Sequence, residues 1–158
     1  MAWIDRLNRL IGEKLAWLYL LAVAVTVYEV VMRYVLNLPT TFGFEVTVFL
    51  CATAYLMAGG YVTARDEHIA ITSLQTILPQ AWTRRLKLFG HLVGIAAMVG
   101  LIWASWRSGL NAVLIVERTG SAWNGPTPAI IKPMITLAAV LVLLQLLANV
   151  HRLLRRQD

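Results

Sequence analysis

The chain has 158 residues, of which 59% are hydrophobic and 14% are charged, and its formal net charge is +6. A soluble domain carries about 25% charged and about 45–50% apolar residues, so this composition excludes an ordinary soluble protein. The basic residues lie between apolar runs and form no stripe or patch, which argues against nucleic acid as a partner. With Cys51 as the single cysteine, an intrachain disulfide and a thiolate metal cluster are excluded.

Each of four apolar segments reaches the roughly 17–25 residues that a spanning helix needs. They are residues 15–36, 44–64, 86–116 and 133–150. No strand-like alternation is long enough for a barrel, and nothing is left over for a soluble domain. The first apolar run is too long for a signal peptide and no cleavage pattern follows it. We therefore predict one all-α membrane domain, residues 1–158, with four transmembrane helices.

Two polar stretches show an amphipathic pattern outside these segments. In residues 1–14, Trp3 and Leu7 share one helical face and charged residues occupy the other. Residues 69–79 repeat the pattern and end at Pro79. Such helices lie in the membrane interface and contact lipids. We predict an interfacial helix at each place; a solvated loop is the alternative for the second.

The first spanning segment contains Glu29 and Arg33. An isolated charge at the centre of a membrane helix costs roughly 2.5–3.5 kcal/mol, so these two need partners. Being four residues apart, they share one helix face and can pair with each other. Alternatively, one of them pairs with Glu45 on the second segment. A structural network is the favoured interpretation; contact with a partner subunit ranks second and contact with a substrate last.

The third segment is longer than a bilayer requires, and Trp103 marks its outer interface. We expect residues 111–118 to project outward. Gly90 and Gly94 lie on one face and permit close helix packing, within this chain or against a partner.

The outer loop that follows is rich in turn-forming residues, and the start of the fourth helix is ambiguous. Thr127 is one possible start, but Pro133 would then interrupt the first turns. A start at Lys132 and Pro133 avoids the interruption, so we predict the fourth helix over residues 133–150.

Catalytic chemistry has little support in this sequence. Of the histidines, His68 and His151 lie at segment ends and only His91 enters a helix, so a haem held between two histidines is disfavoured. No nucleotide-, metal- or nucleophile-binding motif is present, and no chain of acidic and histidine residues crosses the membrane. We predict a non-enzymatic membrane subunit without a cofactor; a subunit of an electron-transport assembly or another membrane complex stays open.

Orientation follows from the lysines and arginines that flank the segments, since cytoplasmic flanks are enriched in them. One side carries Arg6, Arg9, Lys14, Arg65, Arg84, Arg85, Lys87, Arg152, Arg155 and Arg156, and the other carries Arg33, Arg107, Arg118 and Lys132. We predict that both termini are cytoplasmic.

Several short motifs, in order along the chain, resemble those of a known family. Arg33-Tyr34 resembles an "RY" pair near the outer end of the first helix. In "TTFGFEV", Glu45 matches the second acid of a W-x-E-E motif, whose other key positions hold Phe42 and Phe44 here.

Two later stretches extend the likeness. In "ARDEHIAI", Arg65 and His68 match, while Thr72 replaces an aspartate. In "GPTPAIIKP", Pro126 and Lys132 match. Together, over residues 1 to about 150, the chain resembles the small, Q-type membrane subunit of tripartite ATP-independent periplasmic (TRAP) transporters.

The resemblance implies a subunit of a secondary transporter in the bacterial inner membrane. A periplasmic binding protein would deliver an organic anion, a carboxylate or sugar acid, to a large M-type subunit that holds the substrate and sodium sites. The small subunit would pack on the static scaffold of the large one while the transport domain moves. Docking of the binding protein is expected at Glu117, Arg118 and Trp123; the alternative for Trp123 is the outer aromatic belt.

Overall fold

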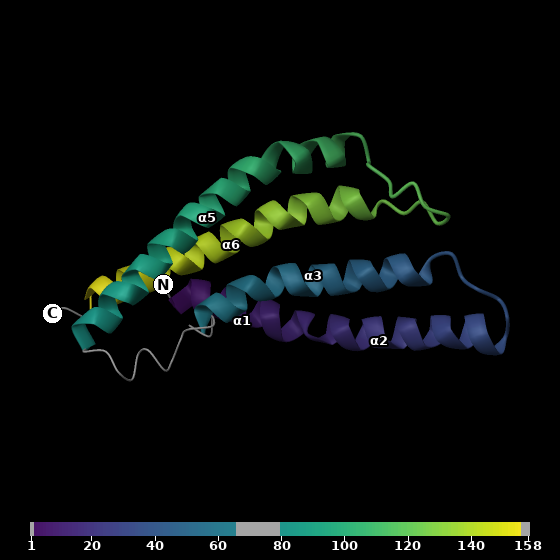
Figure 1. The fold of residues 1–158 in the computed structure, drawn as a ribbon, viewed down its shortest axis with the longest axis horizontal. Coiled ribbons are helices and arrows are strands. Elements are labelled where there is room, and N and C mark those ends of the chain that lie inside the picture. Colours follow the sequence, from purple (N-terminus) through teal and green to yellow (C-terminus); the bar gives the residue numbers. More distant parts are fainter. Residues whose placement is uncertain (1, 66–79, 156–158) are drawn as a thin grey trace.

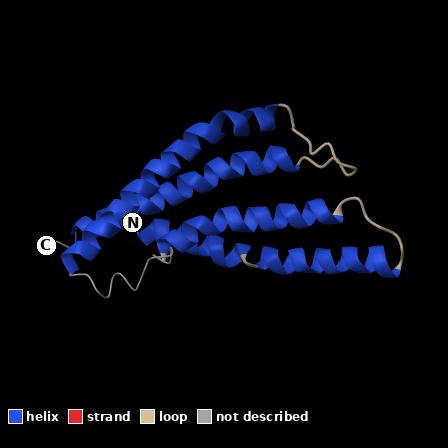
Figure 2. Cartoon of the chain, viewed as in Figure 1, coloured by secondary structure: helices blue, strands red, loops and turns tan. Residues whose placement is uncertain are grey.

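The structure, a computed structural model, describes residues 2–65 and 80–155. Its regular elements are α1 (Ala2–Leu15), α2 (Trp17–Val30), the π-helix η1 (Val31–Val35), α3 (Gly43–Ala64), α5 (Gln80–Leu114) and α6 (Thr127–Arg155). Within these two ranges no strand occurs (Figure 2). Four stretches are long and apolar enough to cross a membrane: Trp3–Val35, Gly43–Ala64, Trp82–Leu114 and Thr127–Arg155. The predicted all-α class with four spanning helices is confirmed.

The long helices form a single layer in the order α5, α6, α3, α2 (Figure 1). α6 packs against α5 and α3, and α3 packs against α2. The beginning of α1 and the end of α6 lie at the same end of the layer, which we call the inner end, and α1 lies there against α3 and α6. The loops after η1 and after α5 lie at the opposite, outer end, toward which the two helical hairpins diverge.

α1 and α2 are nearly continuous. The break is a single turn at Ala16, whose N–H still bonds the carbonyl of Gly12 at 3.1 Å. Gly12 also sets the distance between α1 and α3, because a Cβ there would lie 2.6 Å from Cγ of Tyr61. α1 includes residues 2–14 of the predicted interfacial helix 1–14, while the predicted segment 69–79 lies outside the described residues.

α2 widens into a π-helix before it ends. The N–H of Leu36 bonds the carbonyl of Val31 at 3.2 Å, a five-residue spacing that inserts one extra residue into the turn. Asn37 then takes a left-handed conformation (φ 54°), which asparagine tolerates, and the chain turns toward α3. The π-turn contains Arg33 and Tyr34, so it determines where these two side chains point.

α5 ends two residues earlier than the predicted 86–116, at Leu114, and begins earlier, at Gln80. A Schellman motif terminates it: the N–H of Glu117 bonds the carbonyl of Ala112 at 2.9 Å, and the N–H of Val116 bonds that of Val113 at 3.2 Å. Val116 therefore occupies the left-handed position (φ 48°), where a β-branched residue is strained.

α6 begins at Thr127, so the predicted start at 133 was wrong, and Pro133 lies inside the helix. Pro133 cannot donate to the helical ladder, but proline is tolerated within spanning helices where a neighbouring helix packs against it. α5 provides this neighbour: a Cβ on Gly109 would lie 3.1 Å from Cα of Pro133. This close approach of α5 to Pro133 is not evident from the sequence pattern.

Candidate functional site: polar clusters between the helices

Gln145 lies at the centre of a buried polar network at the inner end of the layer. Its side chain is 0% exposed. The side-chain oxygen accepts a hydrogen bond from Asn8 Nδ2 at 2.9 Å. The side-chain nitrogen donates to Asp5 Oδ1 at 2.6 Å and to Asn149 Oδ1 at 3.2 Å. One glutamine thereby joins α6 to α1.

An ion pair extends this network toward the inner surface. Arg152 Nη1 and Nη2 contact the two carboxylate oxygens of Asp5 at 2.8 and 2.9 Å, and Nη2 also donates to Asn149 Oδ1 at 2.6 Å. Asn149 Nδ2 in turn donates to the carbonyl of Thr63 at 3.0 Å. We call this set the inner cluster: Asp5, Asn8, Thr63, Gln145, Asn149 and Arg152. It ties α1, α3 and α6 together.

The inner cluster is not among the site residues that the sequence predicts. A signal is present, because Gln145, Asn149 and Arg152 recur at spacings of four and three on one face of an otherwise apolar helix. Asp5 and Asn8 are three residues apart and share a face of α1. The amphipathic pattern places Asp5 on the polar side of that helix, and only the packing of α1 on the layer shows that this side meets protein.

Glu29 and Arg33 form the outer hairpin cluster. Arg33 Nη2 lies 2.5 Å from Glu29 Oε1, and Nε donates to the same oxygen at 3.1 Å. The other carboxylate oxygen accepts from the Thr40 hydroxyl in the loop. Glu29 also packs at the start of α3, where a Cβ on Gly43 would meet it at 2.5 Å. Carboxylates are favourable at helix N-termini, so Glu29 joins both helices of this hairpin.

Glu45 does not take part in that pair. It accepts hydrogen bonds from the hydroxyls of Thr119, at 3.0 Å, and of Ser121 in the outer loop. Lys132 Nζ pairs with Glu117 at 2.5 Å and so holds the end of α5 beside the start of α6. These contacts form the outer loop cluster, which links α3 to the hairpin of α5 and α6.

The outer loop is folded onto itself around Gly125. Arg118 donates to the carbonyl of Asn124 at 3.1 Å, and the N–H of Thr119 bonds the carbonyl of Gly125 at 3.1 Å. The Trp123 ring covers Gly125, where a Cβ would lie 2.5 Å from a ring carbon. Trp123 is 41% exposed, so it forms part of a preformed surface.

The remaining predicted residues fall in different surroundings. Gly94 lies in the α5–α6 contact, where a Cβ would lie 3.1 Å from Cδ1 of Leu146, whereas a Cβ on Gly90 would meet nothing within 4 Å. The Arg65 guanidinium lies 4.7 Å from the centre of the Tyr61 ring. Tyr34 is 74% exposed, and His68 lies outside the described residues.

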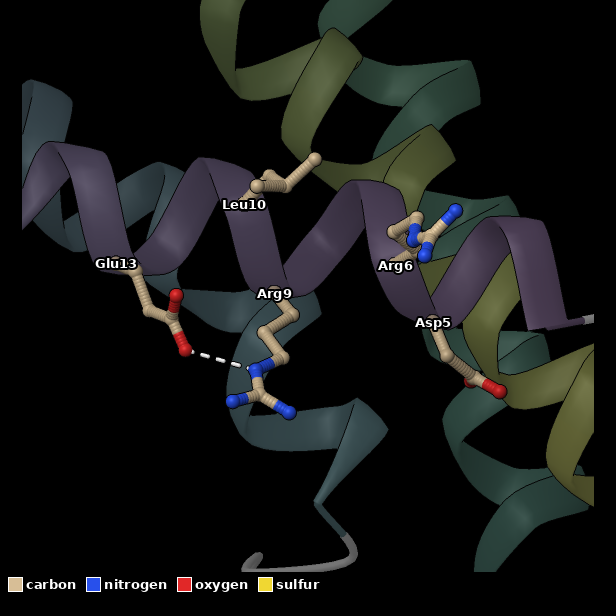
Figure 3. A pocket seen from close by; sticks show the side chains of 5 residues that line it. All are labelled: Asp5, Arg6, Arg9, Leu10 and Glu13. Carbon is tan, nitrogen blue, oxygen red and sulfur yellow. Dashed lines mark hydrogen bonds and ion pairs between the residues drawn. The ribbon is translucent and has the colours of Figure 1, made fainter.

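A shallow groove of about 360 Å³ runs along α1 (Figure 3). It is lined by Asp5, Arg6, Arg9, Leu10 and Glu13. All five come from successive turns of one helix, and Arg9 is held by Glu13 at 2.8 Å while Asp5 belongs to the inner cluster. The groove therefore offers no converging reactive groups. Among residues 2–65 and 80–155, no three His, Cys, Asp or Glu side chains gather as a metal site.

Comparison with known proteins agrees with this geometry. A family model described as "Tripartite ATP-independent periplasmic transporters, DctQ component" matches residues 22–156. A search of curated proteins gives no match. The matched residues cover most of the chain: the last nine residues of α2, and η1, α3, α5 and α6 in full. The chain belongs to the DctQ family, and it is a multi-pass small membrane component of a TRAP transporter and not an enzyme.

Proposed function

We propose that this chain is the static scaffold of its transporter and holds the large permease subunit in place without itself carrying substrate. The observation that carries this proposal is that the polar side chains between the helices hydrogen-bond one another. The inner cluster joins three helices, and the hydroxyls of Ser105 and Thr136 join α5 to α6 at 2.8 Å. Polar groups that bond each other stabilise an assembly, whereas a transport path needs polar groups open to a passing solute.

The transported substrate is an organic anion of the carboxylate or sugar-acid class, and a sodium gradient drives its uptake. In this proposal the substrate and sodium sites lie on the large M-type subunit, and a periplasmic binding protein supplies the anion. Family membership supports this assignment.

The proposal is tested in proteoliposomes that contain both membrane subunits. With the binding protein outside and an inward sodium gradient, we expect uptake without ATP, and no uptake when potassium replaces sodium. Screening organic acids for a rise in the melting temperature of the binding protein identifies the substrate to use. Robust sodium-driven uptake by liposomes holding this chain alone would overturn the scaffold role.

Both termini face the cytoplasm in this proposal. The inner end carries exposed basic side chains that include Arg6, Lys14, Lys87 and Arg155, as expected of cytoplasmic flanks. A reporter enzyme that is active only in the periplasm, fused after the last residue, should stay inactive. Activity of that fusion would reverse the orientation.

The outer loop is the proposed docking surface for the binding protein. Trp123 offers a half-exposed ring on a loop already ordered by hydrogen bonds, so docking requires little further ordering. Arg118, which donates to the carbonyl of Asn124, adds a positive charge next to Trp123 in the loop, and Glu117, paired with Lys132, adds a negative one at the start of the loop. A small mixed surface suits a transient encounter.

Trp123→Ala tests this surface, with Trp103→Ala as the matched control because Trp103 is 85% exposed on α5. The Trp123 variant should need more binding protein for half-maximal uptake, while the two membrane subunits still copurify. Unchanged uptake at limiting binding protein, or an equal effect of the control, would contradict docking at this loop.

A further inference from the structure

Glu45 is an acidic residue at the outer end whose described partners are hydroxyl groups. The other two acidic residues there pair with cations, Glu29 with Arg33 and Glu117 with Lys132. Within residues 2–65 and 80–155, Glu45 forms no ion pair, and it accepts its hydrogen bonds from the outer loop. It lies in the first turn of α3, where a helix N-terminus favours a carboxylate even without a cation.

The two carboxylate oxygens of Glu45 hold two different loop residues. Thr119 Oγ1 donates to Oε2 at 3.0 Å, and Ser121 Oγ donates to Oε1. The two hydroxyl oxygens lie 3.0 Å from each other, so one carboxylate reaches both. Hydrogen bonds to an ionised acceptor are stronger than those between neutral groups. The loop is therefore fastened to α3 at two points by a single side chain.

Ser121 also belongs to the turn that carries Trp123. Its Oγ accepts a hydrogen bond from the N–H of Asn124 at 3.2 Å, and Asn124 Oδ1 accepts one from the N–H of Gly120 at 3.2 Å. Trp123 lies between Ser121 and Asn124 in the sequence. The bond from Glu45 to Ser121 thus fixes the same turn that presents the Trp123 ring.

These contacts bridge the two helical hairpins where the helices diverge (Figure 1). At the inner end, Asn149 of α6 donates to the carbonyl of Thr63 in α3 at 3.0 Å. At the outer end, Glu45 of α3 reaches the loop between α5 and α6. The loop is consequently held from both hairpins, by its own helices on one side and by Glu45 on the other.

We propose that Glu45 is a positioning residue for docking of the periplasmic binding protein. Its carboxylate fastens the outer loop to the first turn of α3, and the fastened loop presents Trp123 at one fixed place on the outer surface. This inference rests on the docking role given to the loop in the proposed function. A loop that is already ordered loses less conformational freedom on docking, so the partner binds more tightly.

The distance between the loop and α3 tests the fastening directly, in proteoliposomes that hold both membrane subunits. Nitroxide labels are attached after Ala122→Cys in the loop and Tyr55→Cys, with Cys51→Ser removing the native thiol. Tyr55 is 77% exposed, and it lies ten positions after Glu45, about 15 Å along the helix. Pulsed electron paramagnetic resonance then measures the distance between the labels.

We expect one narrow distance distribution when Glu45 is present and a broad one after Glu45→Ala. Phe44→Ala is the matched control, because Phe44 is the preceding residue of α3 and is 74% exposed; it should keep the distribution narrow. A distribution that stays narrow and unshifted after Glu45→Ala would overturn the inference.

Uptake at varied binding-protein concentration tests the consequence for docking. Glu45→Ala should raise the concentration needed for half-maximal uptake several-fold and leave the maximal rate unchanged. Thr119→Val together with Ser121→Ala removes the same bonds from the loop side, so adding Glu45→Ala to that pair should cause no further rise. A fall in the maximal rate at an unchanged half-maximal concentration would mean that Glu45 only stabilises the subunit, and would overturn the inference.

Trp123→Ala separates this inference from the proposed function. If Trp123→Ala raises the half-maximal concentration and Glu45→Ala does not, Glu45 is not a positioning residue, while the docking surface stands. If neither variant changes it, docking at the outer loop is wrong, and the role of Glu45 fails with it.

Discussion

Replacing Gln145 by leucine should destabilise the chain by about 2 to 4 kcal/mol. Leucine fills a similar volume but removes three hydrogen bonds, which run to Asn8, Asp5 and Asn149. Hydrogen bonds between membrane helices contribute about 0.6 kcal/mol each and at most about 1.7. The loss is larger here because Asn8, 1% exposed, keeps a buried amide without its acceptor, and an orphaned polar group costs about 1–3 kcal/mol.

In the assay, the purified chain is unfolded in mixed micelles by increasing amounts of a denaturing detergent. Its tryptophan fluorescence reports the fraction unfolded. Asn8→Ala alone and the double variant complete a thermodynamic cycle with Gln145→Leu. The two changes should couple by about 0.5 kcal/mol or more, because they remove the same bond. Additive effects, or a Gln145→Leu chain as stable as the original, would refute the idea that the inner cluster holds α1 against α6.

The remaining predictions use the same unfolding assay. Gly12→Ala should destabilise the chain by about 1–3 kcal/mol, because the added methyl group collides with the Tyr61 ring of α3. Gly100→Ala, where a Cβ would meet nothing within 4 Å, should instead stabilise it by up to about 1 kcal/mol through helix propensity. Equal effects of the two changes would refute the close packing of α1 on α3. Val116→Gly should stabilise by up to about 1 kcal/mol by relieving the left-handed strain, while Val113→Gly inside α5 should lose a few tenths of a kcal/mol of helix propensity, and the opposite order would contradict the Schellman ending. Lys132→Met should cost no more than about 1 kcal/mol, since the ion pair is partly exposed, and the loss should shrink in high salt; a loss that salt leaves unchanged would show that the charge is not what matters.

Much of the fold could be predicted because a membrane constrains a sequence locally. Backbone groups in hydrocarbon must bond within their own segment, so long apolar runs become helices, and their lengths count the spans. The Glu29–Arg33 pair was among the predicted alternatives because it too is local: residues four apart lie on one helix face, close enough to pair.

The contacts between helices could not be predicted from the sequence and are known only from the tertiary structure. α6 starts at Thr127 and keeps Pro133 inside it, next to Gly109 of α5. Glu45 has its partners in a loop 74 and 76 residues further along the chain.

The inner cluster shows the same limit, because Asn8 and Gln145 are 137 residues apart. Composition and periodicity determined how many helices this protein forms and which side chains share a face of each. Which faces meet depends on the rotation and axial position of every helix against its neighbours. Those are set by the packing of all side chains together, and only the tertiary structure decided them.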